Sequence, residues 1–212
     1  DCHAARAYAY YATFGGGAAA WQSALTALQG SFLNAGATTR AQLDAGVYQV
    51  YSTSTGDATN PLTLATSTTL YAHQSFQADA QLKADGTKDA RYLLKFKEGL
   101  PSRSGPLTAD GPTSGTSTLG PNLYLTASTS QGVIRNEELI LLRAEARLAT
   151  GDKAGAIADL NQVRVNSGGL PASTLTAASP DADVLTGILY EKRFSLYLEG
   201  TVSYTHLRAH ET

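Results

Sequence analysis

One stretch of the sequence, residues 133–170, constrains the fold most, because it has the pattern of two helices joined by a short turn. Apolar residues occupy so much of the first helix that it is expected to be buried on more than one side. Gly151 is predicted to end that helix, and Asp152 to cap the next one. Gly168 and Gly169 are predicted to end the second helix. Its buried stripe is predicted to consist of Ala156, Ile157, Leu160 and Val163.

Four polar residues interrupt the apolar faces of this predicted hairpin, namely Arg143, Glu145, Asn161 and Arg164. A buried charge is costly unless it has an opposite charge and hydrogen bonds. An arginine that bridges carboxylates across the helix pair would meet that need. We therefore predict ion pairs inside the hairpin.

The amino-terminal part of the chain is predicted to form a similar hairpin over residues 2–33, broken by the glycines at positions 15 to 17. Its first helix would present one face, made by Ala4, Tyr8 and Tyr11. Its second helix would bury a stripe that consists of Trp21, Ala24, Leu25, Leu28 and Phe32. Together with residues 135–166, this gives two predicted helical hairpins.

A final helix is predicted over residues 180–199, with Ser179 as its cap and Pro180 at its first position. It is expected to pack on the second hairpin. Its predicted buried stripe consists of Leu185, Ile188, Leu189 and Leu196.

The middle of the chain, residues 34–132, is predicted to be rich in loops. A short strand is expected near residues 47–51, a return to helix over 68–82, and a strand or short buried segment over 91–96. Residues 101–132, rich in Gly, Pro, Ser and Thr, are expected to form an exposed loop. The predicted fold class is mainly α, with tetratricopeptide-like (TPR-like) hairpins, an irregular middle insertion and short strands.

Five motifs occur in order in the second half of the chain: IRNEEL, LLRAEA, AIADLNQVR, GGL and ILYEKRFSLYLEG. In this order they resemble the C-terminal part of the SusD/RagB family of nutrient-binding outer-membrane lipoproteins. The resemblance implies a mainly helical, SusD-like protein on the outer face of a Bacteroidota outer membrane. It also implies that an oligosaccharide or peptide is passed to a SusC-like TonB-dependent transporter.

The motif positions of that family are interpreted as structural framework rather than as ligand contacts. They correspond here to Arg135, Glu138, Glu145, Asn161, Arg164, Glu191, Arg193, Glu199 and Gly200. Lys192 and Ser195 stand where the family often has an arginine and a glutamate, which is expected to weaken the pairing slightly. The ligand contacts of the family lie outside these motifs, so the resemblance assigns no ligand-binding residue.

Composition excludes several classes of partner and indicates how much of the protein this chain represents. With a net charge of −2 and scattered basic residues, the sequence lacks the clustered positive charge that nucleic acids require. It has no apolar run long enough for a transmembrane helix. The absence of methionine indicates a processed protein or a fragment, and the opening Asp1-Cys2 inside a helical pattern favours a fragment that lacks its N-terminal half. The family resemblance implies a lipid anchor, which is expected to lie outside this chain. Cys2 is not expected to be that anchor, because a helix is predicted to begin there at once.

The sequence predicts a protein that is not an enzyme, with no catalytic residue, cofactor or metal. Common catalytic motifs are absent. Glu137 and Glu138 are adjacent on a predicted helix and point about 100° apart, so they do not form a glycosidase pair. His3 and His73 are distant in sequence. A protein-binding helical-repeat adaptor and, less favoured, a secreted glycosidase remain as alternatives.

Binding of a sugar would call for exposed aromatic rings, because the apolar faces of sugars stack on them. The large aromatic residues outside the clearest core pattern are Tyr48, Tyr51, Tyr71, Tyr92 and Tyr124. Trp21 lies on a predicted buried stripe and is expected to be core. For each of the others, packing is favoured over sugar contact.

The last residues, 201–212, are predicted to be a non-native tail after a partial SusD/RagB-like domain over residues 1–200. The segment VSYTHLRAHET resembles the translation of a transposase-type sequencing adapter, and the helical pattern ends where it begins. We therefore expect that the tail has no function and that its His206, Arg208 and His210 form no site.

Overall fold

The computed structural model describes residues 2–63, 71–101, 103–106 and 114–199. By their contacts these residues form two units, one made of residues 2–48 and 132–199 and the other of residues 49–131. Gly200 and the predicted adapter-derived tail lie outside the described residues.

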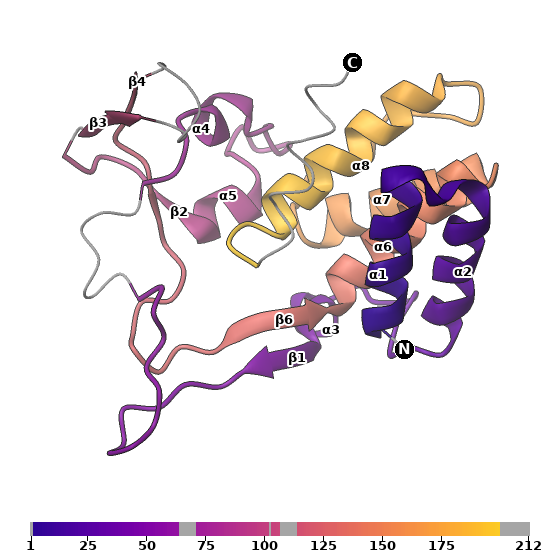
Figure 1. The fold of residues 1–212 in the computed structure, drawn as a ribbon. Coiled ribbons are helices and arrows are strands. Elements are labelled where there is room, and N and C mark those ends of the chain that lie inside the picture. The colour runs from indigo at the N-terminus through magenta and orange to yellow at the C-terminus, as the bar shows by residue number, and fades with distance from the viewer. Residues whose placement is uncertain (1, 64–70, 102, 107–113, 200–212) are drawn as a thin grey trace. The chain divides into compact units, whose positions relative to one another are not determined.

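The first unit contains most of the helices, and its secondary structure confirms the mainly α fold class with two helical hairpins (Figure 1). Its helices are α1 (Cys2–Tyr11), α2 (Gly17–Gln29), α3 (Arg40–Asp44), α6 (Asn136–Ala149), α7 (Lys153–Asn166) and α8 (Asp181–Ser195). A π-helical turn, Ala12–Gly16, joins α1 to α2. Two short strands, β1 (Gly46–Gln49) and β6 (Gln131–Arg135), pair with each other.

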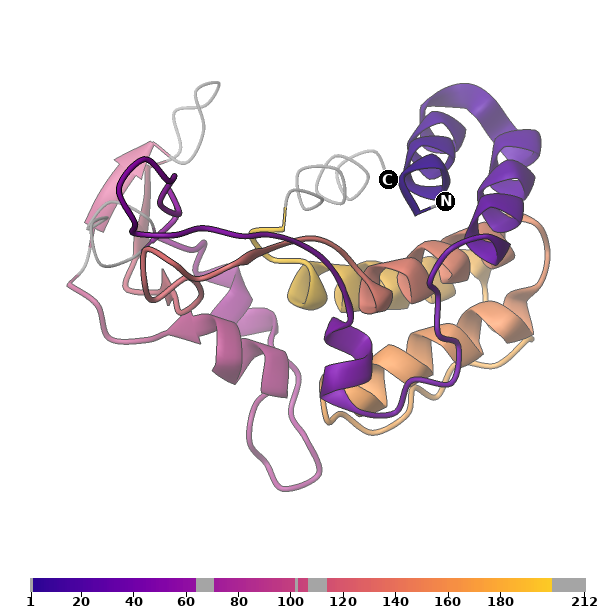
Figure 2. The ribbon, with the colours of Figure 1, turned by 90° about the horizontal axis from the view of Figure 1, so that it is seen from below.

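Helix α6 lies between the α1–α2 hairpin and α7, as the two views show (Figures 1 and 2). Its residues belong to three separate apolar clusters. Leu139 and Leu142 pack with α1 and α2. Ala144 packs with α7 and α8, while Ile140 and Leu141 pack with α3 and α7. The predicted burial of this helix on more than one side is therefore confirmed.

The turn between α6 and α7 has the predicted glycine and the predicted helix cap. Gly151 has a φ of 91°, a conformation that other residues rarely adopt. The Asp152 carboxylate then accepts a hydrogen bond from the Gly155 amide at 2.9 Å, which caps α7. Helix α7 ends at Asn166, just before the predicted glycines. Its stripe is buried as expected, at Ala156, Ile157, Leu160 and Val163.

The first hairpin forms where predicted, but the buried face of α1 is shifted. Ala5 and Ala9 are buried, whereas Tyr8 and Tyr11 are exposed, so the face named from the sequence is not the buried face of α1. Small alanine side chains allow the closer approach between helices, which bulky tyrosines would prevent. On α2 the predicted stripe is buried at Trp21, Ala24 and Leu28, but the helix ends at Gln29 and leaves the predicted Phe32 exposed.

Helix α8 is shorter than predicted. Pro180 is its cap rather than its first residue, and the helix ends at Ser195 instead of continuing to Glu199. Leu198 has a φ of 59°, which a continuing right-handed helix does not permit. The buried residues are Val184 and Ile188, together with Leu196 beyond the helix, whereas the predicted Leu185 and Leu189 are only half-buried. The predicted packing of this helix on the second hairpin is confirmed by a shared apolar cluster with α6 and α7.

Strand β1 lies directly against the end of β6. A Cβ atom on Gly46 would lie 2.2 Å from the backbone oxygen of Ile134, so only glycine fits at this position. The predicted strand near residues 47–51 thus begins one residue earlier and ends at Gln49. Strand β6 ends at Arg135, which follows Ile134, and so places this residue at the start of α6.

The second unit contains short elements and a small core of its own. They are α4 (Ser75–Asp79), α5 (Ala90–Lys95), β2 (Phe96–Lys97), β3 (Arg103–Pro106), β4 (Ser114–Ser117) and β5 (Gly120–Pro121). Strand β2 pairs with β5, and β3 with β4, both antiparallel. Rings of Tyr92 and Phe76 each lie against Phe96, with centroids 5.2 and 4.7 Å apart.

Several predictions for the middle of the chain are corrected. Residues 91–95 are helical rather than a strand, because Asp89 caps α5 by accepting a hydrogen bond from the Arg91 amide. The predicted return to helix over 68–82 is confined to Ser75–Asp79 among the described residues. The predicted exposed loop over 101–132 contains strands and the buried residues Leu119 and Tyr124.

The packing of α7 gives a test within one helix. Val163 is fully buried and Val165 is 44% exposed. Val163→Ala is expected to lower the free energy of unfolding by about 2 kcal/mol, because it removes buried methyl groups and leaves a cavity. Val165→Ala is the matched control, with an expected change below about 0.5 kcal/mol. Urea unfolding followed by circular dichroism measures both, and equal losses would contradict this packing.

Candidate functional site

The polar side chains of the first unit form a set of ion pairs around α6, here called the α6 ion pairs. Arg135, at the start of α6, contacts the most partners. Its guanidinium donates to both carboxylate oxygens of Glu199 at 2.8 Å and to Glu137 at 3.0 Å. It also donates to Asp44 and to the backbone oxygen of Ser195. The start of α6 is thereby attached to the turn that follows α8.

The charges around Arg135 have a clear electrostatic effect. Burial alone would lower the pKa of its guanidinium, but the Glu137 and Glu199 carboxylates outweigh burial and the pKa is raised. Glu137 also accepts a hydrogen bond from the Ser195 hydroxyl at 2.6 Å. This arginine therefore stays charged at every pH at which the protein folds.

Each of the other α6 ion pairs joins α6 or α7 to another helix. Lys192 of α8 lies 2.7 Å from Glu145, and both side chains are 3% exposed. Arg164 of α7 lies 3.0 Å from Glu191 of α8. The remaining contacts in the set join Arg6 to Glu138, and Arg143 and Arg147 to Asp159.

The structure places the family motif residues mostly in these pairs, in separate locations along the helices. Arg135, Glu138, Glu145, Arg164, Glu191 and Glu199 all take part in the α6 ion pairs. Asn161 accepts a hydrogen bond from the Ser173 amide at 2.7 Å. The Arg193 guanidinium lies 5.8 Å from the ring centroid of Phe194. Gly200 is outside the described residues.

Sequence reasoning missed several partners in this set. Arg6 lies 132 residues from its partner Glu138, and Asp44 lies 91 residues from Arg135, so no local pattern marks either pairing. Asp159 had a usable signal, because it interrupts the buried stripe of α7 beside Leu160. Lys192 and Ser195, where the chain departs from the family pattern, both bond to carboxylates of α6.

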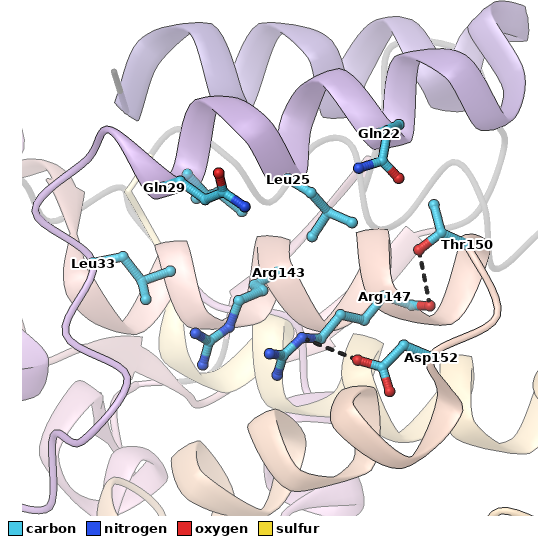
Figure 3. Close-up of a pocket in the computed structure, with 9 residues that line it drawn as sticks. Gln22, Leu25, Gln29, Leu33, Arg143, Arg147, Thr150 and Asp152 are labelled. Atoms are coloured by element: carbon cyan, nitrogen blue, oxygen red, sulfur yellow. Dashed lines mark hydrogen bonds and ion pairs between the residues drawn. The ribbon is translucent and has the colours of Figure 1, made fainter.

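A pocket of about 310 Å³ lies beside α6, flanked by α2 and by the α6–α7 turn (Figure 3). Figure 3 shows Arg143 and Arg147 next to each other on α6, with Gln22 and Leu25 across from them on α2. The remaining lining residues are Leu28, Gln29, Leu33, Thr150 and Asp152. Of the eight family motif residues that the structure describes, none lines this pocket.

The aromatic residues singled out from the sequence lie mostly within packed regions. Trp21 is buried in the core, as predicted. Tyr92 and Tyr124 are buried in the second unit, and Tyr71 is half-buried.

Hydrogen bonds hold the hydroxyl groups of three of these tyrosines. The Tyr48 hydroxyl donates to the backbone oxygen of Asp44 at 2.5 Å, and that of Tyr51 donates to Gln131 at 3.3 Å. The Tyr71 hydroxyl donates to the backbone oxygen of Pro101.

Histidines and acidic residues do not gather into a metal site in the part of the chain that the structure describes. His3 and His73 are exposed, and His73 bonds to Ser75. Across the same described residues, no helix combines the length and the apolar character needed to cross a membrane.

The buried pair of Lys192 and Glu145 gives a stability prediction. Lys192→Met leaves the Glu145 carboxylate buried without its cation, so unfolding free energy is expected to fall by roughly 3–5 kcal/mol. The control is Lys153→Met, because Lys153 pairs with an Asp181 side chain that is 70% exposed. That change is expected to cost less than about 1 kcal/mol. Chemical unfolding measures the free energy of unfolding of both variants. Comparable losses in the two would contradict the assignment of Lys192 and Glu145 as a buried pair that stabilises the fold.

Glu138 gives a prediction on pH. Burial raises the pKa of its carboxyl, and the hydrogen bonds and charge of Arg6 offset only part of that rise. Because the folded pKa exceeds the unfolded value of about 4.3, this contribution to stability is present at low pH and is lost as the pH rises through the folded pKa.

The variant Glu138→Gln removes this titration. The unfolding free energy of the original chain, minus that of the variant, is therefore expected to be smaller at pH 7 than at pH 4. Urea unfolding at both pH values measures it. A difference that increases with pH would mean that the hydrogen bonds and charge of Arg6 outweigh burial and lower the folded pKa of Glu138.

The sequence and the fold were compared with known proteins. The model of the SusD family matches residues 119–208, which include α6, α7 and α8. Among curated proteins, none matches the sequence.

Solved structures match the fold. A SusD superfamily protein from Bacteroides vulgatus matches with a TM-score of 0.61 and 16% identity, over 96% of this chain and 51% of that protein. A SusD superfamily protein from Bacteroides fragilis matches with a TM-score of 0.60 and 17% identity, over 96% and 52%. NanU from B. fragilis matches with a TM-score of 0.56 and 16% identity, over 95% and 53%.

The chain thus spans about half the length of the solved structures that it matches. Residues 119–208 are thus similar to the SusD family, and the fold of the chain is similar to that of solved SusD superfamily proteins.

Proposed function

We propose that the protein to which this chain belongs binds an oligosaccharide or peptide nutrient at the outer-membrane surface and delivers it to a TonB-dependent transporter. The observation that carries this proposal is the family match over α6, α7 and α8. Proteins of the SusD family are binding proteins rather than enzymes. Similarity to that family supports a function in binding, and the nutrient and the transporter are proposed on the same basis.

The ion pairs formed by acidic residues of the motif segments support a binding protein with a rigid framework. Glu137 and Glu138, the adjacent acidic pair, are both engaged with arginines, so their carboxylates stabilise the fold. A glycosidase instead needs two carboxylates that face a sugar from opposite sides. The α6 ion pairs thus favour the proposed binding function over the glycosidase alternative.

The order of elements along the chain also bears on the adaptor alternative. Repeat adaptors stack helical pairs directly upon each other along the sequence. Here residues 49–131 separate the α1–α2 hairpin from the α6–α7 hairpin. This arrangement favours a family-type binding protein over an array of contiguous repeats.

The proposed partner is a SusC-like transporter, and the proposed location is the cell surface, reached through a lipid anchor outside this chain. Both follow from the family and are open to direct test. Affinity purification of the tagged full-length protein from detergent-solubilised outer membranes is expected to recover a TonB-dependent transporter. Recovery of other proteins without a transporter would argue for the adaptor alternative.

Calorimetry of the full-length protein with panels of oligosaccharides and peptides tests the binding function. We expect saturable binding of at least one class of ligand, and recovery of that ligand unchanged after prolonged incubation. Chromatography of the incubated ligand is the control for turnover. Hydrolysis of a bound ligand, or no binding by either class, would contradict the proposal.

A further inference from the structure

The pocket beside α6 holds two arginines that share a single buried carboxylate. Arg143 donates to Asp159 through Nε at 2.9 Å and through Nη2 at 2.6 Å. Arg147 donates to the same carboxylate through Nη1 at 2.9 Å. Figure 3 shows the two guanidinium groups side by side. Three guanidinium nitrogens therefore converge on one acidic group.

Each arginine keeps donors that the protein itself does not engage. Within the described ranges of the chain, no hydrogen-bond partner is found for Nη1 of Arg143 or Nη2 of Arg147. A guanidinium carries five N–H donors in a planar fork that matches a carboxylate. The unused nitrogens are thus suited to a second carboxylate.

The acidic residues nearby do not fully balance the positive charge of the two arginines. The Asp159 side chain is 3% exposed and balances one of the two positive charges. The Asp152 carboxylate is 54% exposed and lies 3.4 Å from Nε of Arg147. Because it also caps α7 through Gly155, and because exposed pairs contribute little, it balances the second charge only weakly.

The other walls of the pocket define the rest of the ligand. Gln22 and Gln29 are exposed on α2 and offer amide donors and acceptors. Leucines at positions 25, 28 and 33 add apolar surface. A volume of about 310 Å³ is at the small end for a ligand pocket. It suits a single sugar or amino-acid unit.

We propose that this pocket binds a small molecule through its carboxylate, held by Arg143 and Arg147. Gln22 and Gln29 bind the neighbouring hydroxyl or amide groups of the ligand. Two sources share this chemistry, an acidic sugar and the C-terminal carboxylate of a peptide. The proposal goes beyond the nutrient-binding function and does not depend on it, because the site lies wholly within the first unit of this chain.

Nuclear magnetic resonance titration of the ¹⁵N-labelled 212-residue chain tests this site. The probes are glucuronate with neutral glucose as its control, and N-acetylleucine with N-acetylleucinamide as its control. We expect saturable shifts of the Arg143 and Arg147 Nε–H signals and of the Gln22 and Gln29 amide signals with at least one acid. The matching neutral compound is expected to bind at least about tenfold more weakly, because it lacks the charge-assisted hydrogen bonds.

The pattern across the probes identifies the source of the carboxylate. Binding of glucuronate alone indicates an acidic sugar, and binding of N-acetylleucine alone indicates a peptide terminus. Binding of both indicates that the carboxylate suffices. Each of these outcomes supports the proposal, whereas no saturable binding of either acid, or equal binding of the neutral controls, overturns it.

Charge variants separate this pocket from general attraction to the protein. Gln22→Glu places a carboxylate on the pocket wall and is expected to weaken binding at least about tenfold, by repulsion and by competition for the arginines. Gln29→Glu is a second variant with the same expected effect. Thr186→Glu adds the same charge at an exposed position of α8 that does not line the pocket, and is expected to leave binding unchanged. Equal affinities in all three variants would overturn the assignment of the site.

Discussion

The structure of the first unit depends on the burial of α6 against α1, α2, α3, α7 and α8. The buried polar side chains of this helix are shielded from water, so each of them needs a partner from a neighbouring element. Glu138 bonds to Arg6 of α1, Glu145 to Lys192 of α8, and Arg143 to Asp159 of α7. Apolar contacts bring the helices together, and the α6 ion pairs specify which residues face each other.

Arg135 extends the same principle to chain segments that are not helical. It lies where β6 becomes α6, and it bonds to the turn after α8 and to the end of α3. Gly46 allows β1 to lie against this junction, because any side chain there would clash with Ile134. Glu199, the family motif position that bonds to Arg135, therefore has a partner within the protein itself.

The pocket and the described family motif positions use different side chains, although Arg143 of the pocket lies within the segment LLRAEA. The motif residues contact other residues of the first unit, while the pocket uses side chains from α2, α6 and the α6–α7 turn. A framework that already holds Arg143 and Arg147 in place reduces the entropy lost when a ligand orders them. The pairing that stabilises α6 thus also prepares the proposed carboxylate site.

The sequence alone determined the helical hairpins, the turn at Gly151 and the cap at Asp152, because these features depend on local spacing and backbone preference. Its ordered motifs also indicated the similarity to the SusD family that residues 119–208 show. The buried face of α1 was decided by tertiary structure, since only contact with other helices favours Ala5 and Ala9 over the tyrosines. The partners Arg6, Asp44 and Lys192 were decided in the same way. Ion pairs between distant segments leave no periodic pattern in the sequence, because their geometry exists only after the helices have packed.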